Sequence, residues 1–162
     1  MSGDSKSGAK SGFESPYVVL KRIPQFFLPR VGRGNRHYVM TKRAMQVGLL
    51  QRKIPVHFAE QKAPEAYRVF ALGGSASLGW PHAFTRSYPY FLQRKLEKLL
   101  PTRNPEVHNL GGMMFPTYKV RILFEEIIEY EPDLILIYAG NNEFLDDALY
   151  LENSEPSATT ME

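Results

Sequence analysis

The 162-residue chain contains no cysteine. This absence excludes disulfide bonds, thiolate metal ligands and a cysteine nucleophile, and it leaves the redox compartment open.

The chain also lacks any apolar run near the roughly 18 residues that a membrane-spanning helix needs. Its start, MSGDSKSGAKSG, has no apolar centre and therefore does not have the pattern of a secretory signal. We expect residues 1–15 to be a disordered tail. Localisation stays open, with the cytoplasm as the default.

Acidic residues are scarce in the first part of the chain. Residues 1–62 hold 12 Lys and Arg against 3 Asp and Glu, whereas residues 63–162 hold 8 against 14, within a net charge of +3. A basic arm of this kind could bind nucleic acid or an anionic membrane, or it could pack against the acidic part of its own chain or simply be solvated. Because the basic residues are scattered rather than clustered, the last two interpretations are favoured and no nucleic-acid partner is expected.

Motifs for metals and cofactors are also missing. The four histidines of the chain share no metal-ligand spacing with one another. No G-K-[ST] follows the glycine-rich turn after residue 72, and the glycines there do not have the G-x-G-x-x-G spacing of a dinucleotide-binding turn. We therefore expect neither a metal nor a cofactor.

The chain divides into a lead-in and one main domain. Residues 16–64 hold short apolar pieces broken by Pro and Gly, and we interpret them as an irregular, basic lead-in that packs on the main domain. Residues 65–150 alternate regularly between two kinds of apolar pattern and form the predicted domain. Residues 151–162 are interpreted as a flexible end.

Strand and helix patterns alternate within the predicted domain. Short apolar runs and 3.6-residue spacing predict, in chain order, a strand over 67–74, a helix over 87–101, a strand over 106–112, a helix over 116–132 and a strand over 133–140. This order predicts a parallel sheet in an α/β domain. The third strand is apolar on both faces, which is typical of a strand that helices cover on both sides.

Each predicted strand ends in a loop rich in glycine and asparagine. The loops read Gly73-Gly74-Ser75, Asn109-Leu110-Gly111-Gly112 and Gly140-Asn141-Asn142-Glu143. Ligands of open parallel sheets bind at the carboxyl ends of the strands, so we expect these loops to meet at one edge of the sheet.

Ser75 has three interpretations at this edge. It could be a nucleophile for acyl transfer, with its own N–H, an N–H of the second loop and the side-chain amide of Asn142 as oxyanion donors. It could be a turn residue only. It could belong to a phosphate-binding loop, although no basic residue stands at that loop. Because Ser77 occupies the place where G-x-S-x-G requires glycine, the pattern counts against a nucleophile elbow of the α/β-hydrolases.

The segments FALGGSASLGWP, NLGG and IYAGNNEF occur in this order, each after a predicted strand. In order and spacing they resemble the first three sequence blocks of the SGNH, or GDSL-type, hydrolases. Together with the run EYEPDL they are more closely similar to a bacterial branch that is often joined to tetratricopeptide repeats. The resemblance covers about residues 66–150.

This resemblance implies a three-layer α/β/α, flavodoxin-like fold and serine esterase chemistry on a small-molecule, carbohydrate or lipid ester. It implies Ser75 as the nucleophile and Asn142 as an oxyanion donor. The backbone N–H of Met114, which stands at the place of the family's second-block glycine, is the further donor. The backbone N–H of Gly112 is the fallback.

The chain departs from the family at three points. Gly74 replaces the Asp before the nucleophile, as is usual in this branch, and Asn141 replaces a histidine. The family's general base, a histidine three residues after an Asp, is missing, because no Asp of this chain has a histidine at that spacing. We expect His82 to be a solvent-facing loop residue and His108 to be a strand residue that faces a helix or solvent.

Two hypotheses follow from the missing base. In the first, the chain is a fragment that carries the N-terminal half of a serine esterase domain, and a missing C-terminal half or a partner chain completes the sheet and supplies the base. In the second, the chain is a non-catalytic binding or interaction module. Both leave the third predicted strand as a sheet edge.

Two residues beside the loops have structural interpretations. Glu143 is expected to orient the third loop by accepting backbone N–H groups rather than to take part in chemistry. Trp80 is expected to pack inside the protein rather than to form a platform for a sugar.

Overall fold

The computed structural model of the protein describes residues 26–31, 35–41 and 56–144. Its strands form two sheets of three. β1 (Phe27–Val31), β2 (Arg36–Met40) and β3 (His57–Ala59) are antiparallel, and β4 (Ala66–Gly73), β5 (Asn104–Gly111) and β6 (Leu134–Tyr138) are parallel. Within the described ranges, no helix is long and apolar enough to cross a membrane. The predicted tail, 1–15, and flexible end, 151–162, lie outside these ranges.

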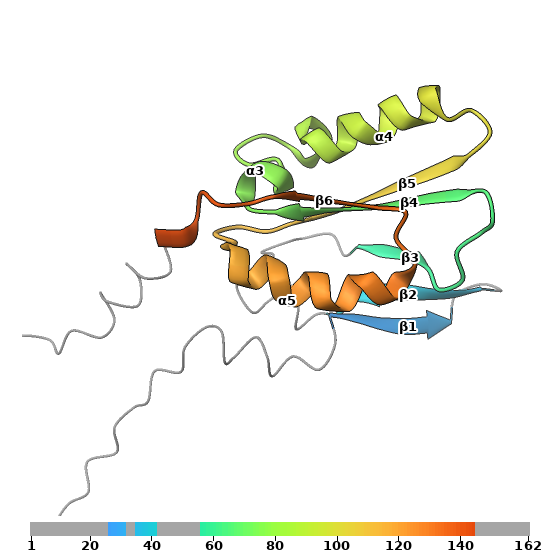
Figure 1. Cartoon of the computed structure of the whole chain (residues 1–162), viewed down its shortest axis with the longest axis horizontal. Helices are drawn as coiled ribbons and strands as arrows, with labels where there is room; N and C mark the ends of the chain where they lie inside the picture. The colour runs from blue at the N-terminus through green and yellow to red at the C-terminus, as the bar shows by residue number, and fades with distance from the viewer. Residues whose placement is uncertain (1–25, 32–34, 42–55, 145–162) are drawn as a thin grey trace, which may run out of the picture.

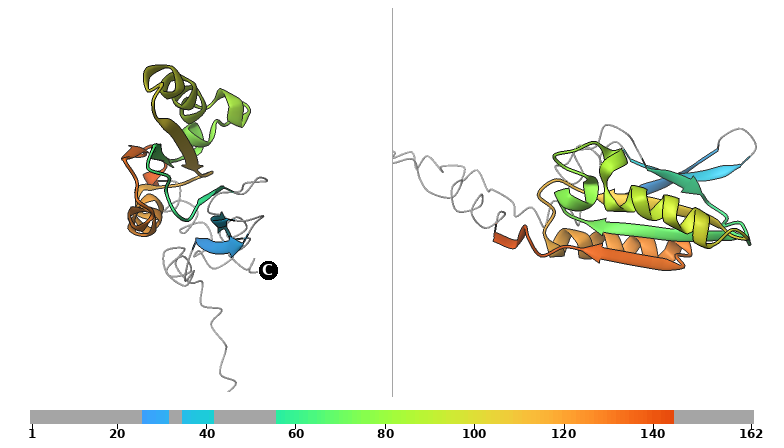
Figure 2. Two further views of the ribbon diagram at one scale, coloured as in Figure 1. Left: turned by 90° about the vertical axis from the view of Figure 1, so that its right-hand side faces the viewer. Right: turned by 90° about the horizontal axis from the view of Figure 1, so that it is seen from above.

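Helices alternate with the parallel strands. They are α3 (Ser75–Leu78), α4 (Tyr88–Leu99) and α5 (Thr117–Ile127), with short 3₁₀ turns η1 (Phe84–Arg86) and η2 (Ile128–Tyr130). The strand order is β5-β4-β6. The chain therefore crosses from β4 to β5 through α4 and returns past β4 to β6 through α5, and these opposite directions place α4 and α5 on opposite faces. Figures 1 and 2 show α4 on one side of the sheet and α5 on the other. The predicted α/β class and three-layer arrangement are confirmed.

The central strand β4 carries the core. Phe70 and Leu72 are fully buried on the face that α5 covers, and Val69 and Ala71 are fully buried on the other face. Asp133 sets the start of β6 against this strand, because its carboxylate accepts the Arg68 N–H at 2.6 Å and its own N–H donates to the Arg68 carbonyl at 2.8 Å.

The lead-in differs from the sequence prediction. Its described residues form the antiparallel sheet β1-β2-β3 rather than an irregular segment. Aromatic packing between strands explains the difference: the centroid of the Phe58 ring lies 5.2 Å from that of Phe27 and 5.2 Å from that of Phe70. Glu126 of α5 also accepts the N–H groups of Phe26 and Phe27 at 2.7 and 2.9 Å. The antiparallel sheet thus packs beside α5, on one face of the parallel sheet (Figure 1).

The prediction that β6 is buried on both faces is wrong. Ile137 is 56% exposed and Tyr138 is 60% exposed. Two features of the fold explain this exposure: within the described residues β6 pairs only with β4, and α4 packs mainly against β5 at the other side of the sheet. A strand with apolar side chains on both of its faces is therefore not always covered by helices on both faces.

Candidate functional site

Ser75 lies at the carboxyl end of β4, where the sequence predicted it. It is the first residue of the short helix α3 and is half-buried. Its carbonyl accepts the N–H groups of Gly79 and Trp80 at 3.0 and 2.9 Å, which closes the helix after one turn. Gly79 makes this possible because its φ of 105° lies in the left-handed region that favours glycine. The tight turn holds the Ser75 side chain at the edge of the sheet.

The side chain of Asn142 reaches the loop that carries Ser75. Asn142 is 5% exposed, and its amide nitrogen donates to the carbonyl of Phe115 at 3.2 Å. A Cβ atom added to Gly74 would lie only 2.3 Å from this nitrogen. The structure therefore brings Asn142 against the residue that precedes Ser75, and it gives a physical reason for glycine at position 74. Because an amide NH₂ carries two hydrogens, one of them remains for a further acceptor.

The two predicted backbone donors of the second loop have different positions. The Gly112 N–H donates to the Gly73 carbonyl at 3.0 Å, so it is engaged in holding the loops together and is not available to a ligand in this conformation. Met114 has a φ of 48°, in the left-handed region, where glycine is the favoured residue. Its carbonyl lies 3.5 Å from the Lys119 ammonium group. Met114 is thus the remaining candidate of the pair.

Asn109 connects several segments of the site through its side-chain amide, whereas the sequence predicted it only as part of a loop. It is 2% exposed, and its amide nitrogen donates to the Ser77 carbonyl at 2.7 Å and lies 3.3 Å from the Ser87 hydroxyl. Its amide oxygen accepts the Gly111 N–H at 2.8 Å. Asn109 therefore ties the second loop to the helix that begins with Ser75. An asparagine directly at a strand end was the available signal, because a buried amide needs several partners.

The second loop also contacts α3 closely. A Cβ atom on Gly111 would lie 2.3 Å from the Leu78 nitrogen. Only glycine permits this approach, so the glycine-rich character of the loop has a packing reason in addition to any functional one.

Glu143 orients the third loop, as predicted. Its carboxylate accepts the Thr117 N–H at 3.0 Å and the Thr117 hydroxyl at 2.6 Å. Thr117 is the first residue of α5, where a carboxylate also interacts favourably with the helix dipole. The third loop is thereby fixed to the start of α5.

The histidines do not complete a catalytic group in the described part of the chain. His82 is exposed, as predicted, and no histidine there hydrogen-bonds to Ser75. The His108 ring packs against the rings of Phe58 and Phe70, at centroid distances of 5.1 and 5.3 Å, on the face that the antiparallel sheet covers. Among the described residues, no group of His, Asp and Glu could hold a metal ion.

The prediction that Trp80 packs inside the protein is wrong. Its side chain is 61% exposed, in the loop that follows α3. The backbone N–H of Trp80 helps to close the turn at Ser75. Nearby, Tyr88 and Tyr138 meet edge to face at 6.1 Å, and burial raises the pKa of Tyr88.

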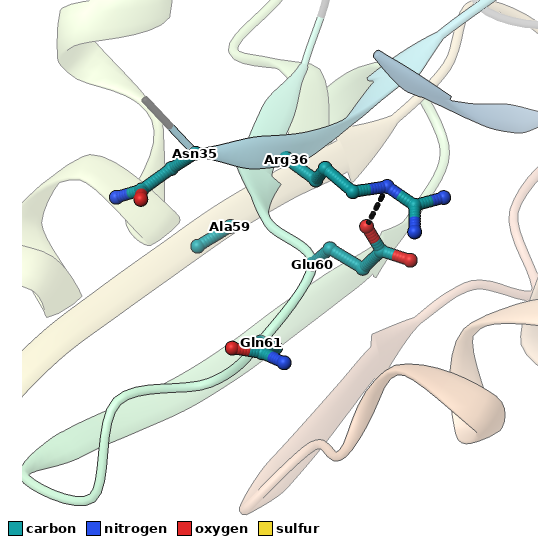
Figure 3. Close-up of a pocket in the computed structure, with 5 residues that line it drawn as sticks. All are labelled: Asn35, Arg36, Ala59, Glu60 and Gln61. Carbon is teal, nitrogen blue, oxygen red and sulfur yellow. Dashed lines mark ion pairs between the residues drawn. The ribbon is translucent and has the colours of Figure 1, made fainter. Parts of the chain in front are cut away.

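A separate hollow lies on the antiparallel sheet. It has a volume of about 340 Å³ and is lined by Asn35, Arg36, Ala59, Glu60 and Gln61 (Figure 3). Arg36 Nε lies 2.8 Å from Glu60 Oε2, so its charges are paired with each other. None of the predicted site residues lines this hollow, and it is distinct from the edge that carries Ser75 and Asn142.

Comparison with known proteins gives a limited result. No protein-family model and no curated protein matches the chain. Among the solved structures that match it are AlinE4, described as an SGNH-hydrolase family esterase, and a mutant of the esterase AlinE4. They are 21% and 22% identical to this chain, cover 53% and 52% of it, and have a TM-score of 0.43. The chain spans less than half of their length, 46% and 45%. A likeness at this identity and TM-score establishes neither a family nor an activity for this protein.

Proposed function

We propose that the protein carries the nucleophile and the oxyanion donors of an SGNH-type serine esterase. The observation that supports this most directly is the position of the Asn142 amide nitrogen, which lies against Gly74, the residue before Ser75. A hydroxyl at a strand end with a buried amide donor beside it is the arrangement that acyl transfer requires.

In the proposed reaction, Ser75 Oγ attacks the carbonyl carbon of an ester. The negative charge that develops on the carbonyl oxygen is stabilised by the Ser75 N–H, the Met114 N–H and the second N–H of the Asn142 amide. Neutral donors of this kind are worth most where they are held in place before the reaction, as Asn142 is by the Phe115 carbonyl. The alcohol then leaves, and water hydrolyses the acyl-enzyme.

The proton of the Ser75 hydroxyl needs a base that the described residues do not provide. We propose that a segment or chain that pairs with β6 brings this base, because among the described residues β6 pairs only with β4 and its other edge is open. The sheet would then be completed and the base placed in one step. The chemical identity of the ester lies beyond this proposal.

The test is covalent labelling of the 162-residue chain with a fluorophosphonate probe at raised pH, where the serine hydroxyl is more reactive and hydroxide takes the place of the absent base. If the proposal holds, mass spectrometry finds the probe on Ser75, Ser75→Ala abolishes labelling, and Asn142→Ala slows it about 100-fold, as loss of one oxyanion donor does elsewhere. Ala76→Ser, an exposed change on the same helix, serves as the matched control and labels at the wild-type rate. Labelling of Ser75→Ala at the wild-type rate would remove Ser75 from the mechanism.

A second candidate function is a non-catalytic binding module built on the same loops. The absence of a histidine partner for Ser75 in the described part of the chain favours it. A folded, monodisperse chain that resists the probe, also at raised pH where a serine hydroxyl is more reactive, supports this candidate. Specific labelling at Ser75 excludes it.

A further inference from the structure

The second and third loops meet at the start of α5 through two contacts. Asn142 donates to the Phe115 carbonyl at 3.2 Å, and Glu143 accepts the Thr117 N–H and hydroxyl. Asn142 and Glu143 are adjacent in the third loop, and their partners Phe115 and Thr117 lie two residues apart at the start of α5. Each loop therefore restrains the other over a short stretch of chain.

The two contacts do different work. The bond to Phe115 holds one hydrogen of the buried Asn142 amide but does not restrain the backbone of the third loop. Glu143 restrains that backbone, because a carboxylate with charge-assisted bonds of 2.6 and 3.0 Å fixes the residue directly after Asn142. Both atoms of Thr117 belong to the first turn of α5, which is itself packed on the sheet through the buried residues Val120 and Leu123.

We propose that Thr117 and Glu143 form a latch that sets the orientation of the Asn142 amide against Gly74. Both are positioning residues, because neither would touch the reacting atoms in the proposed function, on which this role rests. With the latch closed, the Asn142 amide nitrogen occupies the space over Gly74 that a Cβ atom would take. With the latch open, the amide turns away and the oxyanion donor is lost.

The experiment follows the Asn142 side-chain amide directly by NMR. The ¹⁵N-labelled full chain gives two Hδ2 resonances for this group, which Asn142→Asp assigns by their disappearance. We expect Thr117→Val and Glu143→Ala to shift these resonances and to speed their exchange with water at least tenfold. Thr117→Ser, which keeps the hydroxyl, retains the wild-type signals. Arg121→Ala, on the exposed side of the same helix, is the matched control and changes neither.

Unchanged Asn142 resonances in both Thr117→Val and Glu143→Ala would overturn the latch. Glu143→Gln provides a second variant that keeps the size of the side chain, and all variants are compared at a temperature where far-UV circular dichroism shows them folded. Because the NMR signal needs no turnover, the latch is tested even if Ser75→Ala leaves probe labelling unchanged. In that case the proposed function fails while the latch stands. Where the wild type is labelled, Thr117→Val slows labelling and Thr117→Ser restores it.

Discussion

The two ends of the parallel sheet are held together by different chemistry. At the amino end, charged side chains cross between strands, whereas at the carboxyl end the contacts come mainly from neutral amides and backbone groups. Arg68 represents the first end and Asn109 the second; both are buried, at 0% and 2% exposure. The difference separates a region held by buried charges from the region in which we propose the site.

Arg68 shows what the amino end requires. Its guanidinium donates to the Tyr130 carbonyl at 2.8 Å and to the Ala59 carbonyl at 2.9 Å, and its Nε pairs with the Glu106 carboxylate. One side chain thus joins β4 to β3, to β5 and to the turn after α5. A buried cation is tolerated when its charge is paired and its nitrogens are hydrogen-bonded, and here each of the three guanidinium nitrogens has an acceptor.

The carboxyl end has a different requirement. Donors that are to stabilise a developing negative charge must be fixed in place without already neutralising a charge. The Asn109 amide and the Gly112 to Gly73 bond hold the loops with neutral groups. The carboxylate of Glu143 is the charged exception, and it faces Thr117 at the start of α5. This arrangement leaves the Asn142 amide as a neutral, buried donor beside Ser75.

The largest expected effect is at the amino end. Arg68→Met keeps an apolar stem but leaves Glu106 without its partner, and we expect a loss of about 3 to 5 kcal/mol in the free energy of unfolding. Urea denaturation followed by circular dichroism measures it. Arg121→Ala, which breaks an exposed pair with Glu125, is the control and should cost about 0.3 to 0.5 kcal/mol. Similar losses in both variants would contradict the difference between the two kinds of ion pair.

The second prediction concerns the carboxyl end. Gly74→Ala places a methyl group against the Asn142 amide, and we expect about 1 to 3 kcal/mol of destabilisation from overpacking. Asn142→Ala removes the clash, so in that background the same substitution should cost less than half as much. A double-mutant cycle by urea denaturation measures this coupling, and additive losses would show that the two residues do not touch.

The third prediction concerns the response of the amino end to acid. Burial opposes ionisation of Asp133, but Lys62, the Arg68 N–H and Arg103 outweigh it and lower the pKa of this carboxyl. A lowered pKa in the folded state gives stability that is present above the unfolded pKa of about 3.9 and is lost as the pH falls through the folded pKa. Burial likewise opposes ionisation of Glu106, yet His108 and Arg68 lower its pKa, so it adds to the same loss below about pH 4.

Asp133→Asn isolates this contribution. It keeps an acceptor for the Arg68 N–H but removes the charge next to Lys62, which lies 2.8 Å away. We expect a loss of about 1 to 2 kcal/mol at pH 7 and a shallower fall in stability on acidification than in the wild type. Thermal melts from pH 7 to pH 2 measure both. A pH dependence identical to that of the wild type would mean that Asp133 does not carry the effect.

The smallest expected effect is at Met114. Its φ of 48° favours glycine, so Met114→Gly should be more stable than Met114→Ala by about 1 kcal/mol. In an ordinary helix or strand the order is the reverse, with glycine less stable by about 0.5 to 1 kcal/mol. Thermal melts show which of the two variants is more stable. If Met114→Ala is the more stable, the backbone at position 114 is not left-handed in solution.

Several features of this fold followed from the sequence because they depend on local pattern. The helix at 88–99 begins after Ser87 and ends before Pro101, close to the range of 87–101 that the spacing of its apolar residues predicted. Ser87 stands at the N-cap position, but its hydroxyl donates to the Phe84 carbonyl and lies 3.3 Å from the Asn109 amide nitrogen instead of capping the helix. The position of a cap is local, whereas the partner of its side chain depends on the elements that pack nearby.

The lead-in and Trp80 were predicted wrongly for a related reason. Short strands broken by Pro and Gly have no clear period, so the sequence does not show that β3 pairs with β2 or that Phe58 packs against Phe70 of the parallel sheet. Burial of a single tryptophan likewise depends on which elements cover it. In this structure Trp80 follows α3 in a loop, and its side chain is largely exposed.

By itself the sequence determined the β-α-β-α-β order, the α/β class and the glycine-rich loops that follow the strands, because hydrophobic periodicity and turn residues act over a few positions. Only the tertiary structure decided which side chains and backbone groups of different loops and strands come into contact. It brought Asn142 against Gly74, engaged the Gly112 N–H with Gly73 and placed Arg68 between three elements. These contacts join residues far apart in the chain, and they form only when the strands pack side by side and bring their ends together.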